Sequence, residues 1–448
     1  MSANVGEWFA HWVLPQVRQS IDLNLRNRTA TGRDGQQGRD LSDLSDDELS
    51  GVAARCATGE YKFSPYKQLL VIKNANSKPR EVAIPQSRDF LVQKILLAYL
   101  QSAAPVPSPN APKLVSELKT VISDGAKFLR LDLTDFYGSI RHDLLERVLS
   151  NTEMDSAGIQ LVMSAIKTPT LAEGPKRNSE SASTTKGVPQ GLPISNHLAE
   201  LFMATFDKAM KELYPGRYFR FVDDILFVTE SELSNRETDK IAASLSQSGL
   251  SLNKDKQATG DVALGFDYLG YRFTSDMISV RESTRFKYEN SLVRNIRVMP
   301  RNDKTVATPY VKARWRLNLR ITGCVYQGRR IGWLQYFVHL TDLSLLSDFQ
   351  RMVDRQVALD EKWSGFKPKK FLKVLAILRS PSMGLSSSYI PNFDKHSLED
   401  MKSELRKIFG YKEKVLEIMT PDEVRKAFFR EIGREISTLE KEIATNYY

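Results

Sequence analysis

The sequence predicts a mixed α+β fold, and three patterns support that prediction. Residues 128–133 alternate strictly, with leucines on one face and Phe128, Arg130 and Asp132 on the other, as in a half-buried strand. Two short β-type runs, 217–222 and 225–229, are separated only by Asp223 and Asp224, which is typical of a tight hairpin. From about residue 311 to the end, the apolar spacing is helical. We therefore expect antiparallel sheet plus helices, followed by a helical C-terminal region.

The composition is that of a folded protein. The chain has 448 residues, of which 41% are hydrophobic and 26% charged, so it can bury a substantial core. It contains no run of about 20 apolar residues, and its first residues lack the pattern of a signal peptide. The two cysteines, Cys56 and Cys324, are too few for a disulfide framework. We expect a cytoplasmic protein that does not contact membranes.

The first elements follow in order along the chain. Residues 1–60 are expected to form a helical extension, interrupted by a glycine-rich break at 31–38. Ser45 and Glu48 have the spacing of a capping box, which predicts a helix to about residue 58. Extended segments are expected at 69–73 and 80–84. A helix is expected at 87–100, and the proline-rich stretch 104–112 should end it because proline removes a backbone donor.

The later elements are a helix and two strand-rich segments. Ser195 is expected to cap a helix with an apolar stripe at Leu198, Leu201, Phe202, Phe206 and Leu213. Strand-rich segments are expected at 264–273 and 277–281. The predicted domains are therefore an N-terminal helical extension (1–60), a sheet-containing domain (61–280) and a basic helical region (281–448).

Three carboxylates are expected to converge at one edge of the sheet. Asp132 ends its predicted strand, and Asp223 and Asp224 occupy the predicted hairpin tip. If these strands are neighbours, the carboxylates would repel one another unless they were neutralised. Magnesium is a hard cation that is bound by a few carboxylates together with substrate phosphates, and two such ions can activate an attacking hydroxyl. An Asp-Asp turn alone is weak support for a catalytic metal site, because hairpin tips favour aspartate.

The order of motifs resembles that of the prokaryotic reverse transcriptases over residues 61–273. YKFSP (61–65) followed by Lys73, KPR (78–80) and SRD (87–89) looks like their fingers region. LDLTDFYGSI (131–140) is similar to motif A, GVPQGLPIS (187–195) to motif B and FVDD (221–224) to motif C. GLSLNKDK (249–256) resembles motif D, and YLGY (268–271) the primer grip. The resemblance implies a right-hand polymerase with fingers and palm and an α-helical thumb and C-terminal region.

The resemblance also implies roles for individual residues. Two Mg²⁺ ions, which Mn²⁺ can replace, would be held by Asp132, Leu133, Asp223 and Asp224. The incoming dNTP would contact Lys73, Arg80, Asp135, Phe136, Tyr137 and Gln190, with Tyr137 excluding a 2′-hydroxyl by its bulk. Lys256 would protonate the departing pyrophosphate, with Lys254 as a competitor for this role. Leu269 and Gly270 would contact nucleic acid.

A strongly basic segment follows the predicted palm. Residues 281–330 contain thirteen lysines and arginines against three acids, a net charge of +10, and the rest of the chain is neutral overall. Aromatic residues such as Tyr310 and Trp315 are interspersed with these cations. This composition is typical of surfaces that bind phosphates and stack on bases, so Arg314, Arg316 and Arg320 are expected to bind nucleic acid. The alternative is a pair of solvated helix faces.

The finer features favour a defence-associated branch. GLPISNHLAEL (191–201) with Asp207 resembles the abortive-infection and other unknown-group enzymes, and Phe221 replaces the tyrosine common in retron and group II intron enzymes. GRRIGWLQYF (328–337) is similar to a thumb segment of some defence-associated members and points to a two-polymerase type-3 system.

The expected function is synthesis of DNA from dNTPs on an associated noncoding RNA template, in defence against phage. A partner reverse transcriptase or a homo-oligomer is compatible with this expectation. The alternatives are a retron or group II intron-like reverse transcriptase, an RNA-binding scaffold with a palm fold, and an RNA-templated RNA polymerase. Tyr137 and the Pro-Gln-Gly sequence favour DNA synthesis over RNA synthesis.

Overall fold

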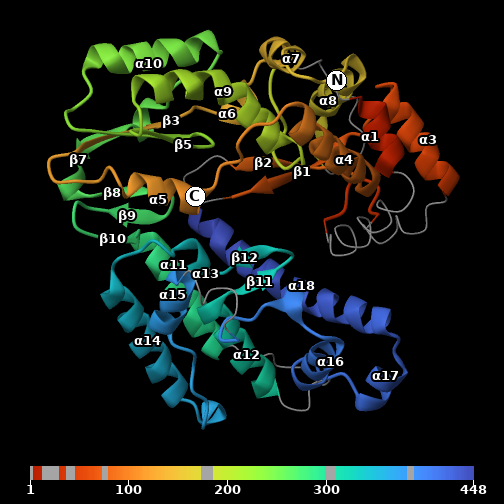
Figure 1. The fold of residues 1–448 in the computed structure, drawn as a ribbon, viewed down its shortest axis with the longest axis vertical. Coiled ribbons are helices and arrows are strands. Elements are labelled where there is room, and N and C mark those ends of the chain that lie inside the picture. Colours follow the sequence, from red (N-terminus) through yellow and green to blue (C-terminus); the bar gives the residue numbers. More distant parts are fainter. Residues whose placement is uncertain are drawn as a thin grey trace. The chain divides into compact units, whose positions relative to one another are not determined.

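The computed structural model describes residues 4–12, 30–36, 46–72, 79–172, 185–297, 309–380 and 388–447 (Figure 1). They form two compact units. Unit 1 comprises Met1–Asn110 and Phe128–Thr259, and unit 2 comprises Ala111–Lys127 and Gly260–Tyr448. The predicted α+β fold is confirmed, because antiparallel sheets and helices occur together. The predicted domain boundaries at residues 60 and 280 stay a prediction.

Unit 1 builds one hydrophobic core from helices and two sheets. Its helices are α1 (Val5–Trp12), α3 (Asp46–Ala57), α4 (Ser87–Ala103), α6 (Phe136–Ser139), α7 (His142–Ser150), α8 (Ser156–Lys167), α9 (Ser195–Leu213) and α10 (Asn235–Gln247). The helix that the capping-box pattern predicts is present as α3, although Ser45 lies outside the described residues. Helix α9 packs against the hairpin strand β5 (Tyr218–Phe221).

A small sheet in unit 1 has the order β2-β1-β4. Strands β1 (Tyr66–Val71) and β2 (Arg80–Ile84) pair antiparallel, with Leu69 opposite Val82. Strand β4 (Thr170–Leu171) pairs parallel to β1. The predicted extended segment 80–84 is present as β2, whereas the predicted segment 69–73 overlaps β1 only at residues 69–71, because β1 begins earlier and ends at Val71. Lys73 lies outside the described residues, so the prediction for this residue stays a prediction.

The larger sheet has the order β5-β6-β3-β7. Strand β3 (Lys127–Asp132) is the predicted alternating strand, and β5 with β6 (Asp224–Thr229) is the predicted hairpin. Strand β7 (Ala258–Asp261) forms the other edge. Because β6 is the neighbour of β3, the tip of the hairpin lies beside the end of β3. This order is the feature that assembles the candidate site.

Unit 2 is mostly helical. It contains α5 (Ala111–Leu118), a sheet of β8 (Phe266–Tyr268), β9 (Tyr271–Phe273) and β10 (Ile278–Val280), and the helices α11 (Glu282–Arg297), α12 (Pro309–Thr322), α13 (Trp333–Tyr336), α14 (Leu343–Ala358), α15 (Phe371–Arg379), α16 (Leu398–Lys407), α17 (Glu413–Ile418) and α18 (Pro421–Tyr447). Helix α16 packs against α18. An aromatic cluster joins α11, α13 and α14, in which the rings of Tyr288 and Trp333 stack 4.3 Å apart.

Three expectations about local structure are wrong. The helical region from residue 311 onward is interrupted by a hairpin of β11 (Cys324–Tyr326) and β12 (Arg329–Ile331), whose turn places Gln327 at a φ of 50°. Ser195 does not cap α9, because its hydroxyl donates to the Pro189 carbonyl at 2.5 Å. Leu213 is 67% exposed and so does not belong to the buried stripe of α9.

Within the described ranges, no helix combines the length and apolarity that a bilayer span requires.

Candidate active site

The structure brings Asp132, Asp223 and Asp224 together at one end of the larger sheet of unit 1. Asp132 is the last residue of β3, Asp223 lies in the hairpin turn, and Asp224 begins β6. The Leu133 amide donates to the Asp223 carbonyl at 3.2 Å, which ties the turn to the end of β3. Burial, and next the negative charge of Asp132, raise the pKa of the Asp223 carboxyl. The backbone hydrogen bond therefore places Asp132 and Asp223 at the same edge of the sheet, where the sequence predicts them.

Two of these carboxylates have a cationic partner. Arg130 Nε and Nη2 donate to the two carboxylate oxygens of Asp224, at 2.8 and 2.7 Å. Burial raises the pKa of Asp224, while the hydrogen bonds and charge of Arg130 act against that rise. Lys256 Nζ donates to Asp132 Oδ2 at 2.8 Å. The charges of Arg80 and Lys256 also oppose the rise of the Asp223 pKa.

The residues present fit magnesium, and Asp132 and Asp223 are the carboxylates that would hold it. Among the described residues, no group of three or more His, Cys, Asp or Glu side chains is arranged as a ready-made metal cage. Magnesium does not need such a cage, because it is usually held by one or two carboxylates plus substrate phosphates. The Asp132 and Asp223 pair meets that requirement. Asp224 is already held by Arg130, and Leu133 can contribute only its main-chain carbonyl, because its side chain is aliphatic and buried.

The segment that carries Lys256 is fixed to the end of β3 by its backbone. The Asn253 amide donates to the Asp132 carbonyl at 2.8 Å, and the Thr134 amide to the Ser251 carbonyl at 2.8 Å. The Asn253 side chain caps the short 3-10 helix η3 (Lys254–Lys256). Lys256 remains 61% exposed while its amine contacts Asp132. This contact distinguishes Lys256 from Lys254 as the amine at the carboxylates.

The predicted sugar-selecting residue lies at the start of the short helix α6. The Tyr137 hydroxyl donates to Asn196 Oδ1 at 2.8 Å, and the Val188 amide donates to the Tyr137 carbonyl at 2.8 Å. Phe136 is 3% exposed and packs in the core, so its side chain supports Tyr137 rather than facing solvent. Asp135 is exposed and has a φ of 42°, in the left-handed region.

The loop that carries Gln190 is held against β2. The Ala83 amide donates to the Gln190 carbonyl at 2.7 Å. Gly191 follows with a φ of 100°, and a Cβ there would lie only 2.6 Å from Val82 Cγ1. Glycine is therefore required both for the backbone conformation and for the close approach. Since Arg80 begins the same strand, the two predicted nucleotide contacts, Arg80 and Gln190, belong to one connected piece of unit 1.

In unit 2, the three arginines predicted to bind nucleic acid all make internal contacts. Arg316 Nε donates to Glu435 Oε2 at 2.8 Å. Arg314 Nη2 donates to the carbonyls of Lys362 and Ser364, and its guanidinium lies over the Phe366 ring. Arg320 is only 6% exposed. Their role in phosphate binding stays a prediction. The exposed cations of the basic segment within the described residues are Arg285, Lys287, Arg294, Arg297, Arg329 and Arg330.

The predicted primer-grip residues Leu269 and Gly270 form a tight turn between β8 and β9. Leu269 is 4% exposed, has a φ of 51°, and its carbonyl accepts from the Tyr336 hydroxyl at 2.8 Å. The Gly270 carbonyl accepts from the Arg281 amide at 2.9 Å. The turn is thus anchored to α13 and to the start of the basic segment, and its contact with nucleic acid stays a prediction.

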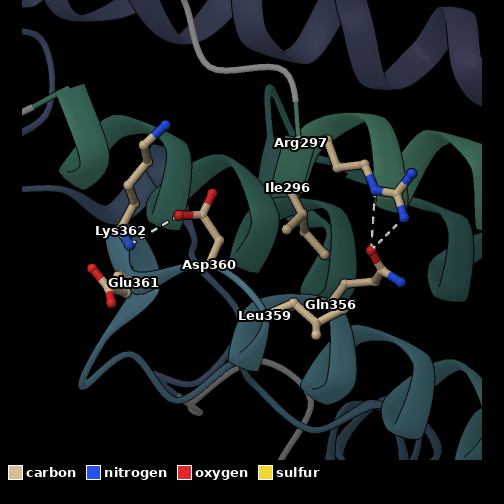
Figure 2. A pocket seen from close by; sticks show the side chains of 7 residues that line it. All are labelled: Ile296, Arg297, Gln356, Leu359, Asp360, Glu361 and Lys362. Carbon is tan, nitrogen blue, oxygen red and sulfur yellow. Dashed lines mark hydrogen bonds between the residues drawn. The ribbon is translucent and has the colours of Figure 1, made fainter.

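A pocket of about 500 Å³ lies elsewhere in unit 2, between the ends of α11 and α14 (Figure 2). Arg297 reaches across it, with Nε and Nη2 donating to Gln356 Oε1 at 3.1 and 3.0 Å. The Lys362 amide donates to Asp360 Oδ1 at 3.0 Å. Its lining includes Asp360, Glu361 and Lys362, but none of its residues is a candidate site residue from the sequence, so we assign no chemistry to it.

Three contacts around the candidate site were not identified from the sequence. Arg130 pairs with Asp224, Asn196 orients Tyr137, and Arg220 forms a buried ion cluster beneath the hairpin. A signal existed for Arg130, because strand alternation puts it on the same face as Asp132, two residues away. Asn196 and Arg220 could not be matched with their partners without knowing how α9 packs on the hairpin.

Residues 72–273 match the family described as reverse transcriptase (RNA-dependent DNA polymerase). The chain therefore contains a reverse transcriptase domain, and the predicted enzyme class, an RNA-directed DNA polymerase with nucleotidyltransferase chemistry, is confirmed. Among curated relatives, Protein YkfC of Escherichia coli is 23% identical, over 58% of this chain and 80% of its own length.

Two yeast proteins also match. A 91 kDa protein in the cob intron of Schizosaccharomyces pombe is 25% identical over 39% of this chain, and a COX1/OXI3 intron 2 protein of Saccharomyces cerevisiae is 22% identical over 47%. The chain spans only 22% and 24% of the length of these two proteins.

Two solved telomerase structures are also similar. The apo telomerase from Candida tropicalis aligns with 13% identity and a TM-score of 0.37, over 60% of this chain and 66% of its own. The telomerase from Candida albicans in complex with a telomeric RNA fragment aligns with 14% identity and a TM-score of 0.43, over 88% and 67%.

Proposed function

We propose that this chain copies an associated noncoding RNA into DNA during antiviral defence. The observation that carries the catalytic part is the convergence of Asp132 and Asp223, with Lys256 bound to Asp132, inside a reverse transcriptase domain. The resemblance of residues 191–201 and 328–337 to defence-associated enzymes supports the proposed role in antiviral defence. The proposed partners are the RNA template, the DNA product, dNTPs, and a partner reverse transcriptase or a second copy of the chain. A cytoplasmic location belongs to the same proposal.

In the proposed mechanism, each residue acts at a defined part of the reaction. Asp132 and Asp223, with Asp224 and the Leu133 carbonyl nearby, would hold divalent magnesium, which when bound activates the primer hydroxyl and neutralises the leaving phosphates. Arg80 would bind the triphosphate by charge-assisted hydrogen bonds. Tyr137, held by Asn196, would contact the sugar and exclude a 2′-hydroxyl. The Gln190 loop would lie beside the new base pair.

Lys256 would supply the proton for the leaving pyrophosphate. Its amine already donates to Asp132, so it lies beside the carboxylates that would hold the metal. General acids of this kind contribute about 100- to 10,000-fold to the rate of a step. We therefore expect Lys256→Ala to lower kcat more than it raises the KM for dNTP, since the loss falls on the transition state.

A group II intron-like reverse transcriptase is the second candidate function. The names of two relatives, a cob intron protein and a COX1/OXI3 intron 2 protein, favour it. The two candidates predict different nucleic acids on the protein. A defence enzyme should carry one noncoding RNA and its DNA copy, whereas an intron enzyme should carry the intron that encodes it.

The test is to purify the protein from its host and to sequence the RNA and DNA bound to it. The matched control is Asp223→Asn, which keeps the size of the side chain but removes its charge. We expect a single noncoding RNA with both proteins and a complementary DNA only with the wild type, together with phage protection that Asp223→Asn abolishes. Recovery of intron RNA, or protection that survives Asp223→Asn, would contradict the proposed defence function.

A further inference from the structure

A buried ion cluster lies beneath the hairpin that carries Asp223. Arg220, on β5, donates from Nη2 to Glu200 Oε2 and to Asp207 Oδ2, both at 2.6 Å, and from Nε to Asp207 Oδ1 at 2.7 Å. The Arg220 side chain is 4% exposed and that of Glu200 is 8% exposed. Tyr218 also donates to Asp207, at 2.6 Å. Both carboxylates belong to α9, so the cluster joins this helix to the hairpin.

One donor of this arginine reaches the turn itself. Arg220 Nη1 donates to the Val222 carbonyl at 2.8 Å. Val222 has a φ of 58°, a left-handed conformation that is rare for a β-branched residue because its Cβ crowds the backbone. Val222 directly precedes Asp223. A strained backbone of this kind persists only when its surroundings hold it in place, and it is often found at functional sites.

The same helix also contacts the residues that are predicted to surround the dNTP. Helix α9 begins at Ser195, whose hydroxyl holds the Pro189 carbonyl next to Gln190, and continues with Asn196, which orients Tyr137. Because Glu200 and Asp207 lie further along α9, one helix connects the residues around the dNTP to the turn that presents Asp223. Arg220 donates to Asp207 through two nitrogens of its planar guanidinium, and lysine cannot reproduce that two-point geometry. An arginine therefore suits the link between α9 and the hairpin.

We propose that Arg220 is a positioning residue for the metal site: it fixes the left-handed turn at Val222 so that Asp223 faces Asp132. The inference rests on the proposed function, because it concerns the metal that the two carboxylates would hold. Arg220 would not contact substrate or metal, and it would act only through the Val222 carbonyl.

The test measures metal binding directly rather than activity. Mn²⁺ serves as the probe, and its binding to the full-length protein is followed by electron paramagnetic resonance, with Mg²⁺ as a competitor. We expect Arg220→Lys to weaken Mn²⁺ binding about 10- to 100-fold, the usual effect of removing a partner that orients a ligand. The matched control is Arg217→Gln on the same hairpin, because Arg217 pairs with Glu230, which is 83% exposed. That control should bind Mn²⁺ like the wild type.

A second variant tests whether Arg220 acts through the backbone conformation of the turn at Val222. Glycine adopts a positive φ without strain, so adding Val222→Gly to Arg220→Lys should recover part of the lost Mn²⁺ affinity. If Arg220→Lys does not fold, the variant Glu200→Gln/Asp207→Asn/Arg220→Met removes all three charges together and leaves none unpaired. It should fold and show the same loss of Mn²⁺ affinity.

The outcomes separate this inference from the proposed function. If the wild type binds Mn²⁺ no better than Asp223→Asn, the metal site itself is misplaced. If the wild type binds better than Asp223→Asn but the folded Arg220 variants bind equally well, Arg220 does not position the site and the inference is wrong. If Val222→Gly recovers no affinity in the Arg220→Lys background, the route through the turn is wrong.

Discussion

The ion pair between Arg130 and Asp224 should be a major local contributor to the stability of unit 1. The two side chains are 33% and 16% exposed, and two charge-assisted hydrogen bonds of 2.8 and 2.7 Å join them. Arg130→Gln would leave the Asp224 carboxylate without its cation in a largely buried position. Breaking a buried pair in this way costs about 3–5 kcal/mol, and the partial exposure of Arg130 places our expectation near the lower end, at about 3 kcal/mol.

The assay is urea-induced unfolding of Arg130→Gln, Asp224→Asn and the double variant. Asp224→Asn removes the buried charge, so we expect the double variant to be less destabilised than the sum of the single variants, with a coupling energy of about 2 kcal/mol. Arg141→Gln is the control, because Arg141 and Asp143 form an exposed pair, with side chains 52% and 46% exposed, whose loss should change the stability little. Equal destabilisation by Arg130→Gln and Arg141→Gln, without coupling to Asp224, would show that the buried pair does not stabilise unit 1 in this way.

Three further predictions concern other parts of the chain. Tyr137→Ala should admit ribonucleotides while weakening dNTP use only moderately, and an unchanged dNTP-to-NTP preference in incorporation assays would exclude Tyr137 from sugar selection. Changing the exposed Lys287 and Arg294 to Gln should make the log-log dependence of RNA affinity on salt shallower by about 0.7 to 0.9 per lost phosphate contact, whereas a slope like that of the wild type would place the nucleic acid elsewhere. The hydrogen bond that His396 donates to the Glu404 carboxylate raises the pKa of His396, so this contact should stabilise unit 2 fully below the ordinary histidine pKa of about 6.5, and the stabilisation should be lost as the pH rises through the folded-state value. The Tm of the wild type should therefore exceed that of Glu404→Gln by more at pH 5.5 than at pH 8.5, and a difference independent of pH would contradict this assignment.

Local patterns predicted the elements that build the site. The alternation around Leu129 and Leu131 gave β3, and the two aspartates between β-type runs gave the hairpin, since both signals depend on residues adjacent in sequence. From the sequence, we could only assume that the hairpin and the strand ending at Asp132 are neighbours. The structure shows that β6 lies next to β3. The acids at the strand end and the hairpin tip could therefore be identified before the sheet order was known.

Partners that depend on tertiary packing were not predictable. No local pattern indicated that Glu435, on α18 and 119 residues away, pairs with Arg316. Ser195 has a residue type that caps helices, yet the motif B loop folds back so that its hydroxyl meets Pro189 instead. The hairpin β11–β12 was missed because its strands are only three residues long and lie within a helical pattern.

Asp132 and Asp223 are proposed to form the metal site of an RNA-directed DNA polymerase. The most direct measurement is incorporation of labelled dNTPs by the purified protein on a primed RNA template with Mg²⁺, compared with Asp223→Asn at equal folded concentration. We predict template-dependent DNA synthesis by the wild type, and a loss of orders of magnitude in the variant with its fold intact. Synthesis by Asp223→Asn at near the wild-type rate, or no synthesis by the wild type with any dNTP, would contradict the account.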